Sequence, residues 1–282
     1  MQVERARELG LCYGIRRALD MIYTATARYG TLQTLGPLAH NRTLLRELQA
    51  QGVMQVDAPE DLAGPTVVVS AHGIAPDTMS LLRDRGFTIL DTTCPNVTRV
   101  QHIAARMARE GLTIVIFGDS RHSEVRGVLG WTGGRGVATL DASAVTDLCA
   151  TCKTGGVGIV SQTTQRLEDY TSFVQHACAA TLAECREIRI VNTLCDATWH
   201  RQKAAAELSR TVDVMVVIGG RNSANTQRLA ETCAESVETH LVETVDELDS
   251  SLLQGKARIG LTAGASTPDS SIEEVEARIL QL

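Results

Sequence analysis

Seven short runs of apolar, largely β-branched residues recur along the chain and constrain its fold more than any other feature. The runs are continuous rather than alternating, which is typical of strands covered on both faces of a parallel sheet. They occupy residues 66–73, 87–94, 112–122, 157–164, 188–195, 213–223 and 258–266. Helical patterns lie between them, for example at residues 95–111 and 196–210. This alternation predicts an α/β fold with parallel sheets.

Each predicted strand ends in a small polar cluster that contains Ser, Thr, His, Asn or Cys. Parallel sheets bind ligands beyond the carboxyl ends of their strands. Seven such ends are too many for one mononucleotide crevice, so we expect several small sheets whose ends converge on one centre. Boundaries near residues 94 and 193 then give three α/β domains, at residues 1–94, 95–193 and 194–282.

The composition excludes several classes of function. The net charge of -6 argues against a non-specific nucleic-acid binder, which normally carries a basic face. Aromatic residues make up only 3% of the chain, which argues against base-stacking platforms and aromatic-lined cofactor pockets. No apolar run approaches the ~18 residues that a membrane span needs, and the charged N-terminal stretch lacks the apolar core of a signal peptide. We therefore expect a cytoplasmic protein without membrane contact, whose eight cysteines stay reduced.

Cys12, Cys94 and Cys195 share one sequence context, because each lies where an apolar segment ends and a helical pattern begins. The N-terminus of a helix favours the thiolate, which is the metal-ligating form of cysteine. The alternative is that they are three unrelated, half-buried cysteines, since free cysteine is among the residues most often buried. The shared context favours a joint role.

Three thiolates without a fourth are informative. A structural zinc site is normally closed by four ligands, and an iron–sulfur cluster usually takes four cysteines. A cluster held by three leaves one iron open to substrate. We interpret the lone C-x-x-C of Cys149 and Cys152 as a surface helix end. The remaining cysteines are interpreted as packing residues in helices: Cys178, Cys185 and Cys233.

His40, His72 and His122 each follow an apolar run by a few residues and could donate hydrogen bonds to a phosphate. Glu124, two residues beyond His122, could serve as a general acid; the alternative is an exposed glutamate in the first turn of a helix. Neutral donors that open helical patterns could complete an anion cradle, although each also fits plain N-capping. These donors lie at residues 161–164, 219–226 and 262–267.

At this point the motifs resemble those of a known family. The matching stretches are "CYGIRRA", "TLGPLAHN", "SAHG", "DTTCPNVTRV", "HSEVRG", "SQTTQ", "NTLCDATWHRQ", "GGRNSANTQRL" and "TAGASTPD". In this order and spacing, they resemble the LytB/IspH family of 4-hydroxy-3-methylbut-2-enyl diphosphate reductases over essentially the whole chain.

The resemblance implies three small parallel-sheet domains in a pseudo-threefold arrangement around a central iron–sulfur cluster. Cys12, Cys94 and Cys195 match the ligands of one [4Fe-4S] cluster with an open iron, with a [3Fe-4S] form expected after oxidation. The positions that match substrate-binding residues are His40, His72, His122, Thr198, Ser223, Asn225 and Ser266. The positions that match catalytic residues are Glu124, Thr163 and His122.

The implied reaction is the last step of the methylerythritol phosphate route to isoprenoids. It removes the allylic hydroxyl of a small diphosphate with two electrons and two protons, giving isopentenyl and dimethylallyl diphosphates. The electrons would come from an external donor such as ferredoxin or flavodoxin.

Two departures from the family pattern keep alternatives open. Ser123 stands where the family usually has proline, and Ala224 stands where many members have serine. They leave open a paralogue that acts on another hydroxylated substrate. Two rivals stand apart from these departures: a non-redox zinc metalloenzyme, and a redox-sensing or ligand-binding protein without turnover.

Overall fold

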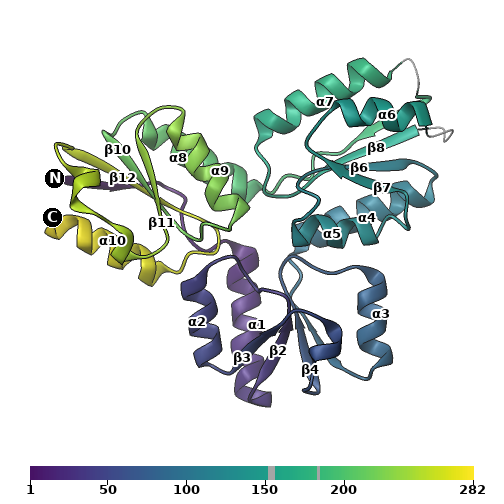
Figure 1. Ribbon diagram of the computed structural model, residues 1–282, viewed down its shortest axis with the longest axis horizontal. Coiled ribbons are helices and arrows are strands. Elements are labelled where there is room, and N and C mark those ends of the chain that lie inside the picture. Colours follow the sequence, from purple (N-terminus) through teal and green to yellow (C-terminus); the bar gives the residue numbers. More distant parts are fainter. Residues whose placement is uncertain (152–155, 183–184) are drawn as a thin grey trace. The chain divides into compact units, whose positions relative to one another are not determined.

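Strands and helices alternate through the computed structural model, which describes residues 1–151, 156–182 and 185–282 (Figure 1). The strands are β1 Gln2–Arg5, β2 Leu32–Leu35, β3 Val53–Val56, β4 Thr66–Val69, β5 Thr88–Asp91, β6 Thr113–Phe117, β7 Gly136–Thr139, β8 Gly156–Ser161, β9 Glu187–Ile190, β10 Val214–Ile218, β11 Thr239–Val242 and β12 Arg258–Ala263. The α-helices are α1 Tyr13–Tyr29, α2 Arg42–Ala50, α3 Pro76–Asp84, α4 Pro95–Arg109, α5 Ser123–Gly130, α6 Ser143–Thr151, α7 Leu167–Thr181, α8 Asp196–Ser209, α9 Ala224–Ala234 and α10 Asp269–Gln281. The 3₁₀ turns among the described residues are Pro59–Asp61, Val245–Glu247 and Ser250–Leu253.

The described strands form three four-stranded sheets, with orders β1-β12-β10-β11, β3-β2-β4-β5 and β7-β6-β8-β9. The pairing is parallel, as between β10 and β12 and between β6 and β8. This confirms the α/β fold with parallel sheets. Contacts divide the chain into two compact units, residues 1–64 with 196–282 and residues 65–195. The three-domain division at residues 94 and 193 stays a prediction.

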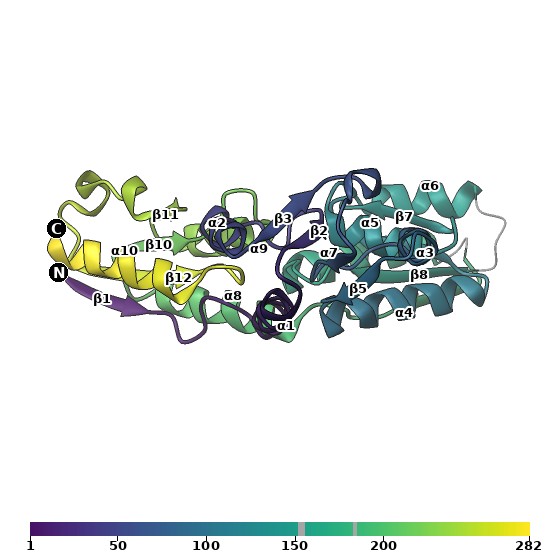
Figure 2. The same ribbon diagram turned by 90° about the horizontal axis from the view of Figure 1, so that it is seen from below.

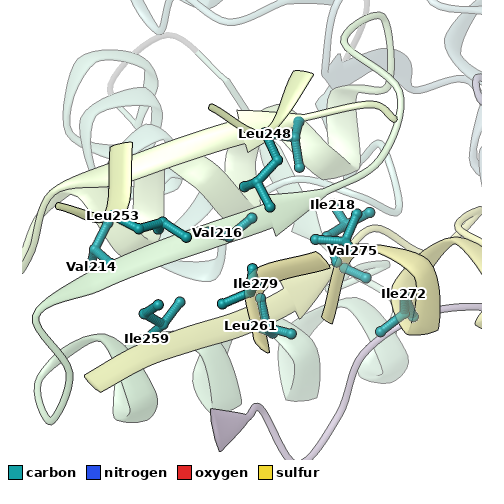
Figure 3. Packing of buried hydrophobic residues seen from close by; sticks show 12 residues of the cluster. Val214, Val216, Ile218, Leu248, Leu253, Ile259, Leu261, Ile272, Val275 and Ile279 are labelled. Atoms are coloured by element: carbon teal, nitrogen blue, oxygen red, sulfur yellow. The ribbon is translucent and has the colours of Figure 1, made fainter. Parts of the chain in front are cut away.

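In the unit of residues 1–64 and 196–282, alternate side chains of β10 and β12 pack against α10 (Figure 3). Val214, Val216 and Ile218 of β10 point to this face and are fully buried. Ile272 and Val275 of α10 cover them. Full burial of a Val or Ile side chain stabilises a fold by roughly 1.5–3 kcal/mol, so this cluster is a main source of the unit's stability.

The other face of the same sheet is covered by α8 and α9 (Figure 1). Met215 and Val217, the alternate residues of β10, pack there against Leu229 and Cys233 of α9. Burial raises the pKa of the Cys233 thiol to about 12, so this cysteine stays protonated and serves as a packing residue. The two chain termini lie at one end of this unit, because β1 pairs with β12 beside α10 (Figure 2).

The unit of residues 65–195 has the same layered plan around β6 and β8. One face carries Ile114, Ile116 and Val160, packed against α4 and α5. The opposite face packs against α6 and α7, where Phe117 lies 4.7 Å, ring centre to ring centre, from Phe173. Because both faces of these central strands are covered, their sequences read as continuous apolar runs.

All seven predicted strands are present, although each is shorter than its run. The sequence analysis did not predict five further strands among the described residues: β1, β2, β3, β7 and β11. Four of the five are edge strands, which have one hydrogen-bonding partner and need less apolar sequence. The predicted helices at residues 95–111 and 196–210 are α4 and α8. No helix among the described residues is long and apolar enough to cross a membrane.

Candidate functional site

The loops after β6 and β8 bring an acid and a hydroxyl together. These strands are neighbours, so the start of α5 after β6 and the loop after β8 lie at one sheet edge. The Glu124 carboxyl group accepts a hydrogen bond from the Thr163 backbone N–H at 2.7 Å and another from Thr163 Oγ1 at 2.7 Å. Glu124 is only 2% exposed and Thr163 only 5%. The alternative of an exposed first-turn glutamate is therefore wrong.

Two histidines belong to the same unit. His122 is the N-cap of α5, and its Nδ1 accepts from the backbone N–H of Glu124 at 3.2 Å. A neutral ring that accepts through Nδ1 carries its hydrogen on Nε2. The ring of His72 meets that of His122 edge-on, with centroids 5.5 Å apart, and Ser70 Oγ lies 3.4 Å from His72 Nδ1. These contacts orient two imidazole rings beside the Glu124–Thr163 pair.

Cys94 and Cys195 also lie in this unit, and both stand at helix starts as predicted. Cys94 is the N-cap of α4, and Cys195 directly precedes α8. The Cys195 N–H donates to the Thr163 carbonyl at 2.9 Å, which ties the thiol-bearing loop to the acid–hydroxyl pair. Asn96 Nδ2, in the first turn of α4, donates to Cys195 Sγ at 3.1 Å. This bond joins the segments that carry the two cysteines.

Cys12, the third candidate ligand, lies in the unit of residues 1–64 and 196–282. It is the N-cap of α1, and its N–H donates to the Ala265 carbonyl at 3.0 Å. The loop before it is held by the buried guanidinium of Arg201, which donates to the carbonyls of Gly10 and Leu11 at 3.1 and 3.2 Å. The sequence analysis gave no role to Arg201 or Asn96, because neither residue type is a common metal ligand or acid.

The donor set fits an iron–sulfur cluster. Cys12, Cys94 and Cys195 are half-buried thiols. Thiolate sulfur is the ligand that iron–sulfur clusters take, and an N–H···S bond such as that from Asn96 is typical around cluster sulfurs. The cysteines interpreted as packing residues differ, since Cys233 is fully buried and Cys178 lies in α7. Cys185 was wrongly expected in a helix and follows α7 instead.

The remaining pair, Cys149 and Cys152, cannot be assigned in the same way. Cys152 lies outside the described residues. The backbone of Cys149 belongs to α6, and its side chain is not among those described. Their exclusion as ligands stays a prediction.

Neutral donors gather at the start of α9. Ser223 is its N-cap and accepts from the Thr226 N–H at 3.3 Å. Asn225 is 7% exposed, and its Nδ2 has no hydrogen-bond partner among the described residues. A buried amide without a partner costs free energy unless a ligand satisfies it. Ser266, after β12, is also 7% exposed, and Thr198 in the first turn of α8 is 5% exposed.

The loop before α9 lies directly against the segment of His40. A Cβ atom at Gly220 would stand 1.9 Å from the His40 carbonyl oxygen, so only glycine fits there. Its neighbour Gly219 has a φ of 148°, which also favours glycine. Burial lowers the pKa of His40, so its imidazole is neutral near pH 7 in the free protein. Sequence reasoning expected a phosphate-binding histidine here but not this close glycine contact.

Fold and side chains together define a class: a parallel α/β protein that carries cysteines at helix starts, a buried acid–hydroxyl pair and a buried amide donor without a partner among the described residues. The LytB protein family model matches residues 3–280, and the chain belongs to that family.

Curated relatives match over nearly the whole chain. A protein of Dehalococcoides mccartyi (strain CBDB1) is 44% identical over 275 residues, which cover 98% of this chain and 96% of the relative. One of Geobacter sulfurreducens is 39% identical over 280 residues, covering 99% and 97%. Both are named 4-hydroxy-3-methylbut-2-enyl diphosphate reductase.

Solved structures agree with the fold. The structure of (E)-4-hydroxy-3-methyl-but-2-enyl diphosphate reductase, the terminal enzyme of the non-mevalonate pathway, matches with a TM-score of 0.74 at 34% identity, covering 100% of both chains. The corresponding reductase from Plasmodium falciparum has a TM-score of 0.91 and covers 100% of this chain and 88% of the other. At 23% identity, that second likeness shows the fold alone.

Proposed function

We propose that this protein reduces 4-hydroxy-3-methylbut-2-enyl diphosphate to isopentenyl and dimethylallyl diphosphates. The allylic C–O bond breaks, the hydroxyl leaves as water, and a C–H bond forms, with two electrons and two protons consumed per substrate. The observation that carries the proposal is the buried Glu124–Thr163 pair, in a chain related over its whole length to proteins named as this reductase.

The proposed cofactor is one [4Fe-4S] cluster held by Cys12, Cys94 and Cys195, with a [3Fe-4S] form after oxidation. Such a cluster supplies electrons one at a time and, at an iron without a protein ligand, a Lewis acid for the substrate hydroxyl. The residues support it through sulfur ligands at helix starts and the hydrogen bond from Asn96 to Cys195 Sγ.

The protein's own groups then bind, orient and protonate. The proposed proton path runs from the Glu124 carboxyl group through the Thr163 hydroxyl, 2.7 Å away, to the departing hydroxyl of the substrate. His122 and Thr198 orient that hydroxyl. The diphosphate is anchored by His40, His72, Ser223, Asn225 and Ser266, so that binding energy at one end of the substrate positions the other.

An external one-electron donor protein such as ferredoxin or flavodoxin is the proposed source of electrons, and the cytoplasm is the proposed location. Nucleic acid and membrane are not expected partners. The direct test is anaerobic reconstitution with iron and sulfide, reduction with methyl viologen and incubation with the allylic diphosphate. We expect both products and a brown protein. A reduced, cluster-loaded protein that leaves the substrate unchanged would exclude this function, and stoichiometric zinc without colour would favour the zinc metalloenzyme.

Asn225→Ala is expected to weaken diphosphate binding by roughly ten- to a hundredfold, because losing a hydrogen bond to a charged group costs about 1.5–3 kcal/mol. Among the described residues the buried Nδ2 has no hydrogen-bond partner, so a bound phosphate oxygen would be its acceptor. Calorimetric titration of the cluster-loaded protein with the substrate measures the effect. Glu231→Gln, at an exposed position of the same helix, is the control and should bind as the wild type does. An unchanged affinity in Asn225→Ala would count against this anchor.

Diphosphate binding is expected to take up a proton at His40. Burial lowers the pKa of this histidine in the free protein, and a bound anion stabilises the imidazolium and raises the pKa again. Affinity should therefore rise as the pH falls from about 8 to about 6, around the ordinary histidine value. The affinity is measured with inorganic pyrophosphate, whose own titration contributes part of the rise. His40→Asn should keep that part and lose the rest. His176→Asn, at an exposed position of α7, is the control. Identical pH profiles for wild type and His40→Asn would refute the idea.

A further inference from the structure

Helix α4 presents a positively charged face that the proposed reaction does not use. Between residues 92 and 109 the chain carries three arginines and one histidine but no Asp or Glu, although the whole protein has a net charge of -6. Arg99, His102, Arg106 and Arg109 are all exposed. At spacings of three or four residues they form one stripe along the helix, opposite the face that packs in the core.

The arginines of this stripe have no carboxylate partners in the part of the chain that the structure describes. Among the described residues, none of Arg99, Arg106 and Arg109 forms an ion pair with a carboxylate. The nearest carboxylates along the chain are engaged elsewhere: Glu110 pairs with Arg189, and Asp91 accepts hydrogen bonds from Thr93. The positive charge of the stripe is thus available to a partner.

An aromatic side chain stands beside the stripe. Trp131, just after α5, lines a groove of about 930 Å³ together with residues of α4 that include Arg99, His102, Arg106 and Arg109. Its Nε1 donates to the Ile74 carbonyl at 3.1 Å, and its ring meets that of His102 at 5.6 Å, so its position is fixed. Tryptophan and arginine are the residues that most often carry the binding energy of protein interfaces.

The N-terminal end of the stripe lies close to the segments of Cys94 and Cys195. The helix starts at Cys94, and Arg99 Nη2 donates to the carbonyl of Asn192, three residues before Cys195, at 3.3 Å. With a rise of about 1.5 Å per residue, the stripe runs from about 8 to about 22 Å along the helix axis from Cys94. A protein seated on it would lie beside the proposed cluster ligands.

From this arrangement we infer that the outer face of α4 with Trp131 is the docking surface for a small acidic electron-transfer protein. The inference rests on the proposed function, since it supplies the route for that reaction's electrons. Each encounter oxidises one reduced donor by one electron, so two encounters serve one substrate. A single helix face is small, and electron-transfer complexes are characteristically small interfaces, often under about 1,200 Å² in total. Charge complementarity would set their rate of association.

The test uses the cluster-loaded protein and a reduced plant-type [2Fe-2S] ferredoxin of negative net charge. Arg106→Glu with Arg109→Glu should raise the ferredoxin Kd at least about tenfold and flatten its dependence on ionic strength. Turnover with reduced methyl viologen should stay at the wild-type rate, because these residues are remote from the site. Arg46→Glu with Arg83→Glu, the same charge change at exposed positions of α2 and α3, should leave the ferredoxin Kd unchanged.

A second double variant, Arg106→Gln with Arg109→Gln, controls for a loss of helix stability in the first. It should raise the ferredoxin Kd too, but by less. Unchanged ferredoxin binding in both double variants, with wild-type circular dichroism, would overturn the inference. So would wild-type protein that binds duplex DNA through these arginines and not the ferredoxin. Because binding is measured without substrate, failure of the proposed reaction would appear separately, as an absence of turnover with methyl viologen.

Discussion

Replacing Glu124 by Gln is expected to slow turnover at least about a hundredfold, the lower end for the loss of general acid catalysis. The amide keeps the size of the carboxyl group and can still accept from the Thr163 N–H, while the Thr163 hydroxyl can turn to accept from the new amide. Packing and substrate binding should therefore survive, and only the acidic proton is lost. Single-turnover reduction of substrate by pre-reduced protein measures the chemical step without an external donor.

Glu168→Gln is the matched control. Glu168 stands in the first turn of α7, as Glu124 does in α5, but it is exposed. This variant should react at the wild-type rate. If Glu124→Gln also kept that rate with its cluster intact, Glu124 would not be the acid, and His122 would become the leading candidate.

Replacing Cys94 by Ser is expected to remove nearly all iron and visible absorbance from the protein. Serine offers a harder and more basic oxygen, which replaces thiolate poorly as a ligand of iron–sulfur clusters. Cys12→Ser and Cys195→Ser should behave alike, because a cluster with three protein ligands has no spare one. Iron analysis and absorbance after anaerobic reconstitution report the loss, and circular dichroism checks the fold.

Cys178→Ser, in α7, is the control with a half-buried cysteine outside the proposed ligand set, and it should keep its iron. Cys149→Ser and Cys152→Ser are expected to keep theirs as well. A normal iron content in Cys94→Ser would contradict the ligand assignment.

The central strands were predictable because burial on both faces leaves a direct mark on the sequence. β4 and β10 read TVVV and VMVVI, and every residue in them is buried. β2 is central too, yet it reads LQTL. Its Gln33 uses a polar side chain structurally, accepting from the N–H groups of Ala63 and Gly64. Local hydrophobicity could not show that.

The edge strands escaped for a different reason. β1 reads QVER, and its charged residues form ion pairs, Glu4 with Arg258 of the neighbouring strand β12 and Arg5 with Glu276 of α10. Charged residues are typical of edge strands, where they discourage pairing with other chains. Such a segment resembles a surface loop until its partner, more than 250 residues away, is known.

For the candidate site, the sequence predicted residues but not the contacts between them. Proline directly after Cys94 predicts a helix start there, since proline is favoured in the first turn. The burial of Glu124, by contrast, depends on β6 lying next to β8. The Asn96–Cys195 hydrogen bond joins residues 99 positions apart. Contacts of this kind are set by strand order, which no local pattern encodes.

The pairing of β1 with β12 has a consequence for how the protein is made. The backbone around Cys12 is held by Ala6 donating to Leu261 and by Cys12 donating to Ala265. These acceptors emerge from the ribosome about 250 residues later, roughly 13–50 s at about 5–20 residues per second. Until then the N-terminal segment has no strand to join, and its thiol is not in its final place. A metal group that requires Cys12 in its final place would therefore be inserted only after β12 and the loop that follows it have been made.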